Sequence, residues 1–237
     1  MLNFGLKHKG TYHEAIPDAV NSYKSWSGYN DEIVTAAAWI AKAAKRLDKE
    51  KYAADVAYAQ TLYDQFTPSE AHEFSWDNKG AGAEYLMYEI TGKKSHKTHF
   101  DNFKSRITGG QKTPGGMWYI QTWGSVRHAT NVAFLFAVSG EKEVAREQID
   151  FVLGHGQKPP LIDGKPGSYQ VGYGGHYPTE PHHAAASCPP PGEDCNWGTF
   201  NKEGPNAWIL HGAVIGKLFF IVFSSISSDF LRFSRIF

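Results

Sequence analysis

Residues 30–66 read NDEIVTAAAWIAKAAKRLDKEKYAADVAYAQTLYDQF, and this stretch indicates the fold class. In its first half, apolar side chains recur at intervals that suit one side of a helix: Ile33, Ala37, Ile40, Ala41 and Ala44. The second half repeats the pattern with Tyr52, Val56, Ala59, Tyr63 and Phe66. Such spacing is typical of amphipathic helices whose apolar side faces a core. The sequence therefore predicts a pair of helices, over residues 30–47 and 49–66.

The same periodicity continues toward the C-terminus. Further helices are predicted over four ranges: residues 77–90, 96–107, 123–138 and 141–153. Gly92, Gly140 and Gly154 lie just beyond three of these ranges, where a glycine favours the end of a helix. Repeated helix pairs with little strand pattern predict an all-α protein.

Residues 168–187, SYQVGYGGHYPTEPHHAAAS, interrupt the helical pattern. They carry several histidines and tyrosines among glycines and prolines, and they show neither helical nor strand periodicity. We therefore expect a long ordered loop, and long loops inside a globular domain are usually functional. Histidine donates or accepts hydrogen bonds near neutral pH, and tyrosine adds a flat face and a hydroxyl group. This combination suits a ring-shaped ligand with many hydroxyl groups.

The charge of the chain is balanced, with 24 basic and 24 acidic residues. A zero formal net charge does not favour nucleic acid or an anionic membrane surface as a partner. A neutral polysaccharide needs no attraction between charges, and we expect such a ligand and a monomeric protein. Aromatic residues make up 14% of the chain, and we expect most of them in the core and only a few as sugar platforms.

The two cysteines, Cys188 and Cys195, lie close together in the segment SCPPPGEDCNW. A disulfide between them is sterically possible and would fit a secreted protein, while two free thiols are the alternative. The first ten residues, MLNFGLKHKG, contain no apolar segment of the kind that a signal peptide requires.

The loop at residues 168–187 resembles the histidine signature of glycoside hydrolase family 9, the endoglucanases that cut β-1,4-glucan. The positions that fit the signature are Ser168, Tyr169, Val171, Gly172, Gly174, Pro178, Pro181, His182 and His183. Two positions depart from it, because His176 stands where the family has asparagine and Ala184 stands where it has arginine. In the family that arginine helps to hold the sugar, and alanine cannot replace its guanidinium group.

Four other segments resemble the family and occur in the family's order: residues 23–43, 74–87, 113–135 and 148–154. The resemblance implies an (α/α)6 toroid, of which a chain of this length would hold only a part, incomplete at both ends. It implies a partial catalytic domain over residues 1–216 and, because such family members are usually secreted, a missing N-terminus. Residues 217–237, KLFFIVFSSISSDFLRFSRIF, do not resemble the family, and our hypothesis for them is a translated intron.

Hydrolysis by this family proceeds with inversion and uses two carboxyl groups, a general base and a general acid. In the family the base belongs to a D-A-G-D motif and the acid to an N-E motif that follows the signature loop. The chain contains neither motif in those places, so we expect that it does not hydrolyse glucan by itself. The alternative is a non-catalytic relative that still binds glucan, and Ala184 favours this alternative slightly.

The resemblance also implies individual site residues. His182 would be the active-site histidine, and the sugar would contact Tyr23, Tyr119, Trp123, His182 and His183. A structural calcium ion, the only cofactor we expect, would be held by Ser27, Gly28, Asp31, Glu32 and Asp77. The alternative for this last group is helix capping, with Ser27 or Asn30 as the N-cap and acidic side chains beside the helix N-terminus. The loop histidines lack zinc-like spacing.

Overall fold

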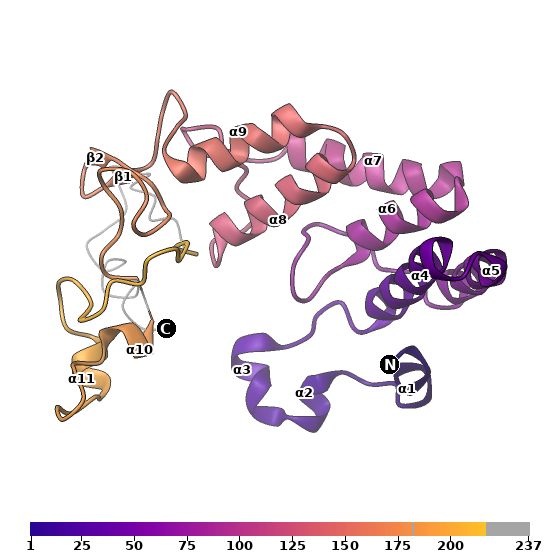
Figure 1. The fold of residues 1–237 in the computed structure, drawn as a ribbon, viewed down its shortest axis with the longest axis horizontal. Helices are drawn as coiled ribbons and strands as arrows, with labels where there is room; N and C mark the ends of the chain where they lie inside the picture. Colours follow the sequence, from indigo (N-terminus) through magenta and orange to yellow (C-terminus); the bar gives the residue numbers. More distant parts are fainter. Residues whose placement is uncertain (182, 217–237) are drawn as a thin grey trace. The chain divides into compact units, whose positions relative to one another are not determined.

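The computed structural model describes residues 1–181 and 183–216, so His182 and the tail at residues 217–237 lie outside the described residues. The described chain is mainly helical (Figure 1). Its elements are α1 (Leu2–Lys7), α2 (Tyr12–Ala15), the 3-10 helix η1 (Pro17–Ala19), α3 (Val20–Tyr23), α4 (Asn30–Leu47), α5 (Lys49–Gln65), α6 (Gly80–Thr91), α7 (Lys94–Thr108), α8 (Ser125–Val138), α9 (Lys142–Leu153), β1 (Leu161–Ile162), β2 (Lys165–Pro166), α10 (Ala184–Ser187) and α11 (Trp197–Phe200). The prediction of an all-α chain is confirmed.

Two compact units make up the chain, and each is described by itself. Unit 1 comprises residues Met1–Gln111 and His128–Ala145, and unit 2 comprises Lys112–Arg127 and the chain from Arg146 onward. In unit 1, α4 packs against α5 and α6, and α6 packs against α7 (Figure 1). Small side chains such as Ala38, Ala41 and Ala59 are fully buried there, which lets the helices approach closely.

The predicted helix ends agree with the structure where a signal in the local sequence, such as a capping glycine, marks them. Helix α4 begins and ends as predicted, and α6 ends at Thr91 with Gly92 as its C-cap, in the left-handed conformation with φ 67°. Helix α7 begins at Lys94, before its predicted start at His96, and α9 begins one residue after its predicted start. Two other starts were predicted too early by two or three residues. Helix α8 begins at Ser125 because Gly124 has φ 66°, which breaks the helical path. Helix α6 begins at Gly80 because Asp77 is held in a turn, as described below.

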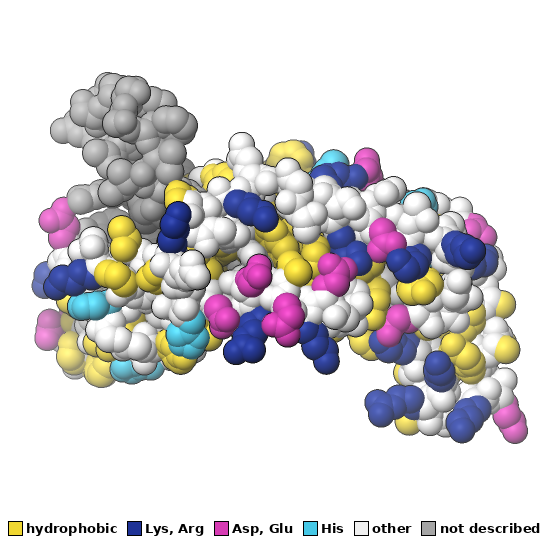
Figure 2. All heavy atoms as spheres, turned by 90° about the horizontal axis from the view of Figure 1, so that it is seen from above, with side chains coloured by type: hydrophobic (Ala, Val, Ile, Leu, Met, Phe, Trp, Pro, Cys, Tyr) yellow, Lys and Arg dark blue, Asp and Glu magenta, His cyan; other side chains and the backbone are white. Residues whose placement is uncertain are grey.

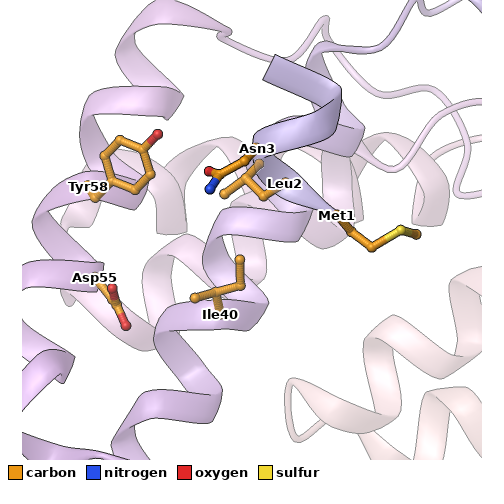
Figure 3. A pocket seen from close by; sticks show the side chains of 6 residues that line it. All are labelled: Met1, Leu2, Asn3, Ile40, Asp55 and Tyr58. Atoms are coloured by element: carbon orange, nitrogen blue, oxygen red, sulfur yellow. The ribbon is translucent and has the colours of Figure 1, made fainter. Parts of the chain in front are cut away.

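The predicted apolar side of α4 was wrong at one position. Ile40 is 45% exposed, because the buried stripe of α4 runs instead through Val34 and Ala38. Ile40 lines a shallow pocket of about 260 Å³, together with Met1, Leu2, Asn3, Asp55 and Tyr58 (Figure 3). The pocket lies among α1, α4 and α5 and contains none of the predicted site residues.

The predicted loop at residues 168–187 contains more regular structure than its sequence suggested. Its start pairs with a distant segment, since Val171 N–H donates to the Ala213 carbonyl at 2.8 Å and Ile215 N–H donates to the Tyr169 carbonyl at 3.0 Å. Its last four residues form α10. The loop is therefore anchored at both ends within unit 2, by long-range pairing that periodicity cannot reveal.

The surface carries no large region of one charge on the face shown in Figure 2, where basic and acidic side chains are interspersed. This distribution agrees with the balanced composition. Within residues 1–181 and 183–216, none of the helices combines the length and the apolar character that a membrane span requires.

Candidate functional site

Exposed aromatic side chains lie at the end of α3 and just after it, in unit 1. Tyr23 is 56% exposed and packs edge-on against Trp76, with ring centroids 5.3 Å apart. Trp26, three residues later, is 77% exposed, and the Lys24 ammonium lies 4.7 Å from the centre of its ring. Trp26 was missed in the sequence analysis, although it lies in the same segment as Tyr23. Flat, exposed aromatic faces of this kind can stack on a sugar ring.

Asp77 fixes the turn that carries Trp26. Its side chain is buried and accepts hydrogen bonds from the backbone N–H groups of Trp26, at 2.9 Å, and Ser27, at 3.3 Å. The Ser27 hydroxyl donates in turn to the Asp77 carbonyl at 2.6 Å. Because these bonds link segments 50 residues apart, they hold the aromatic turn against the loop that precedes α6.

Asp31 and Glu32 stand in the first turn of α4, beside this turn. Asp31 is 1% exposed; its carboxylate accepts from Lys79 N–H at 2.5 Å and lies 3.5 Å from the Ser27 hydroxyl. Burial, and then the neighbouring Glu32 carboxyl group, raise the pKa of Asp31 to about 7. One oxygen of Glu32 lies 2.9 Å from the Lys79 ammonium, while the carboxyl group also interacts with that of Asp31.

These contacts bring together four of the five residues predicted to hold calcium, and Gly28 lies in the same turn with φ 84°. The capping alternative was wrong in one respect, because the N-cap of α4 is Tyr29 and has no side-chain cap bond. The described residues contain no cluster of three or more His, Cys, Asp and Glu side chains arranged for a metal ion. A cation here would therefore need backbone or hydroxyl oxygens besides the carboxylates, and calcium accepts such ligands.

The signature loop in unit 2 is fixed by backbone contacts and by buried side chains. Ser168 and Val171 are each 1% exposed, and Tyr169 packs edge-on against Phe151 at 6.0 Å. Gly172 has φ 81°, and a Cβ atom there would lie 2.2 Å from Nδ1 of His211, so only glycine fits.

His183 caps the short helix α10. Its Nδ1 atom accepts a hydrogen bond from Ala186 N–H at 3.1 Å. A neutral imidazole with an accepting Nδ1 carries its proton on Nε2, so the exposed side of His183 is a hydrogen-bond donor. His182, predicted as the active-site histidine, lies outside the described residues.

The two other predicted sugar contacts also belong to unit 2. Trp123 is 53% exposed, and the half-buried Tyr119 shares a hydrogen bond of 2.7 Å with the Thr122 hydroxyl. Cys188 and Cys195 form a disulfide, with their Cα atoms 5.0 Å apart. The bridge follows α10 directly and ties the end of the signature loop to the segment before α11.

A sequence profile of glycosyl hydrolase family 9 matches residues 1–216. The chain belongs to glycosyl hydrolase family 9. It is 32% identical to an endoglucanase of Dictyostelium discoideum over 90% of this chain and 29% of that protein. It is also 32% identical to Endoglucanase 8 of Oryza sativa subsp. japonica, over 91% of this chain and 47% of that protein. This family 9 chain thus spans half or less of the length of these relatives.

Solved endoglucanase structures agree with the fold. The termite endoglucanase of Nasutitermes takasagoensis is 34% identical and superimposes with a TM-score of 0.74, over 91% of this chain and 48% of that one. Endoglucanase CelQ of Clostridium thermocellum, solved with cellobiose and cellotriose, is 27% identical with a TM-score of 0.64, over 84% of this chain and 34% of that one. The described helices therefore form part of an (α/α)6 toroid, as predicted.

Proposed function

We propose that this chain supplies part of the glucan-binding surface of an endo-β-1,4-glucanase that acts on cellulose or a related β-glucan with inversion. The observation that carries the proposal is the exposed aromatic turn at Tyr23 and Trp26, which Asp77 fixes in place. Family membership, relatives that are endoglucanases and a relative solved with cellotriose support it. Saturable binding of cellotetraose, measured by tryptophan fluorescence, tests it, and an unchanged spectrum at saturating sugar would contradict it.

Catalysis in this proposal depends on carboxyl groups outside the chain. The sequence contains no D-A-G-D motif, and Glu180, inside the signature loop, accepts a hydrogen bond from Gly204 N–H at 3.2 Å. Inverting hydrolysis needs two carboxyl groups placed roughly 6.5–9.5 Å apart across the scissile bond. We therefore propose that the 237-residue chain binds glucan without cleaving it.

A second candidate is a protein that is related to the endoglucanases and binds glucan, but does not hydrolyse it even as the complete gene product. Ala184 favours it, because the family's arginine at this position would donate to the sugar and a methyl group cannot. Sequencing the complete transcript separates the two candidates. An encoded D-A-G-D motif supports the enzyme, and its absence supports the second candidate.

His183 is expected to contact sugar as a donor as well as to cap α10. Replacing it with asparagine preserves an N-cap acceptor but removes the Nε2–H donor, so we expect an unchanged unfolding midpoint and about fivefold weaker binding of cellotetraose. His183→Ala removes both functions and should lower the midpoint as well. Wild-type affinity in the His183→Asn variant would show that the side chain acts only as a cap.

We propose that Ser27, Gly28, Asp31, Glu32 and Asp77 hold a structural calcium ion. The adjacent carboxyl groups of Asp31 and Glu32, and the contacts of Ser27 with Asp31 and Asp77, support this proposal. After EDTA treatment, calcium at about a hundred times its Kd should raise the unfolding midpoint by about 5–10 °C. Magnesium should not, because its smaller shell fits mixed carbonyl sites poorly. An undiminished shift in Asp31→Asn would contradict the proposal.

The pH dependence of stability gives a second test of the same site. Without calcium, Asp31 has a pKa of about 7 in the folded chain, against its ordinary value of 3.8. The folded state therefore binds more protons between these values, so in EDTA the stability should fall as pH rises from about 4 to about 7. Calcium should reduce this slope, since it binds the ionised carboxylate. Denaturation midpoints at several pH values, with Asp31→Asn as control, measure the effect.

The disulfide at Cys188 and Cys195 supports an oxidising, extracytoplasmic environment for the protein. We propose that the enzyme is secreted and monomeric. Size-exclusion chromatography with light scattering tests the second statement, and a dimer mass would contradict it.

A further inference from the structure

Glu84 is a buried carboxylate in the middle of α6, in unit 1. It is 8% exposed, and its oxygens meet three donor groups from neighbouring helices. The Tyr63 hydroxyl donates to it at 2.6 Å, and Nδ1 of His96 and Nδ1 of His99 lie 2.9 Å and 3.2 Å from its oxygens. A buried carboxylate requires such partners, because an unpaired charge in the interior is costly.

His96 faces hydrogen-bond acceptors at both ring nitrogens. Nδ1 meets Glu84, and Nε2 lies 3.1 Å from Oε1 of Gln60. The amide orientation of Gln60 is set on its other side, where Nε2 donates to the Asp64 carboxylate at 2.8 Å. His96 itself is 1% exposed, so water does not supply an alternative partner.

A neutral imidazole has one donor and one acceptor nitrogen, whereas an imidazolium has two donors. With Glu84 and the Gln60 carbonyl oxygen on either side, a neutral His96 would direct a lone pair at one acceptor inside the core. We propose that His96 is held as a buried imidazolium, which ties α5, α6 and α7 together through Gln60 and Glu84. This inference concerns the folded state and does not depend on the proposed function.

The neighbouring groups agree with this assignment. Burial, followed by the Glu84 carboxylate, raises the pKa of Tyr63, so its hydroxyl remains a donor to Glu84. The rings of Tyr63 and His96 meet edge to face at 4.4 Å. The titratable groups around His96 are therefore Glu84 from α6, Tyr63 from α5 and His99 from α7, with Asp64 reached through Gln60.

Nitrogen chemical shifts of the histidine rings test the proposal directly. Long-range ¹H–¹⁵N correlation spectra of the complete chain at neutral pH should show two protonated nitrogens on His96. The His96 signals can be assigned through the shifts that Gln60→Glu causes. One unprotonated nitrogen on His96 would overturn the proposal.

A stability measurement gives an independent test. The double variant Gln60→Glu/Asp64→Asn is compared with Asp64→Asn alone. The background is needed because the Asp64 carboxylate would otherwise lie beside the introduced one and repel it. Next to an imidazolium this carboxylate remains an acceptor, and the unfolding midpoint should rise by about 2–4 °C. Next to a neutral ring whose proton lies on Nδ1, toward Glu84, it would face a lone pair, and the midpoint would fall. Gln65→Glu, on the exposed end of α5, controls for added charge on the helix. A fall relative to this control would overturn the proposal.

Discussion

Trp26→Ala should weaken the binding of cellotetraose about 30-fold. The indole ring is 77% exposed in the free chain, so its face is available to a sugar. Stacking and burial of such a face contribute roughly 2 kcal/mol, and each 1.4 kcal/mol changes the affinity tenfold. Isothermal titration with cellotetraose measures the change.

Trp39 provides the matched control for this prediction. It is 53% exposed on α4, with the Lys42 ammonium 5.1 Å from its ring centre, and it is not one of the predicted site residues. Trp39→Ala should leave the affinity unchanged, and both variants should unfold at the wild-type temperature. Equal losses of affinity in the two variants would show that exposed tryptophans bind the sugar without a specific site.

Asp77→Ala should lower the free energy of unfolding by about 3 kcal/mol. The substitution leaves the N–H groups of Trp26 and Ser27 without their acceptor and removes the link between the aromatic turn and the loop before α6. Because the same turn carries Trp26, the affinity for cellotetraose should decrease as well. Urea denaturation followed by tryptophan fluorescence measures the first effect.

Asp77→Asn separates the role of Asp77 as a hydrogen-bond acceptor from the role of its charge. An amide oxygen can still accept the bond from Trp26 N–H, so we expect roughly half of the stability loss. As a neutral ligand it lowers the negative charge of the proposed calcium site, so stabilisation by calcium should be weaker in Asp77→Asn and lost in Asp77→Ala. An alanine variant as stable as wild type would contradict the anchoring role of Asp77.

The long helices could be predicted from the sequence because their signals are local. The apolar spacing between Ile33 and Ala44 placed α4 at its observed ends, and Gly92 marked the end of α6. The error at Ile40 arises because periodicity does not distinguish two neighbouring helix faces that both carry apolar residues.

The site was harder to predict because its contacts connect distant segments. Asp77 bonds to Trp26 across 51 positions, and this bond delays the start of α6 beyond the predicted residue. His183 could be recognised as a conspicuous loop histidine, but its role as a cap depends on α10, which has no periodic signal. The pairing of His96 with Glu84 and Gln60 joins three helices, and no spacing along one helix reveals it.

The most direct test of the account combines binding and cleavage in one sample. The purified chain is titrated with cellohexaose, and the sugar is then recovered and separated by chromatography after prolonged incubation. We predict saturable binding and recovery of intact cellohexaose, because the proposed binding surface carries exposed aromatic side chains and the sequence contains no D-A-G-D motif. Release of cellobiose or cellotriose by the chain alone, or the absence of binding, would contradict the account.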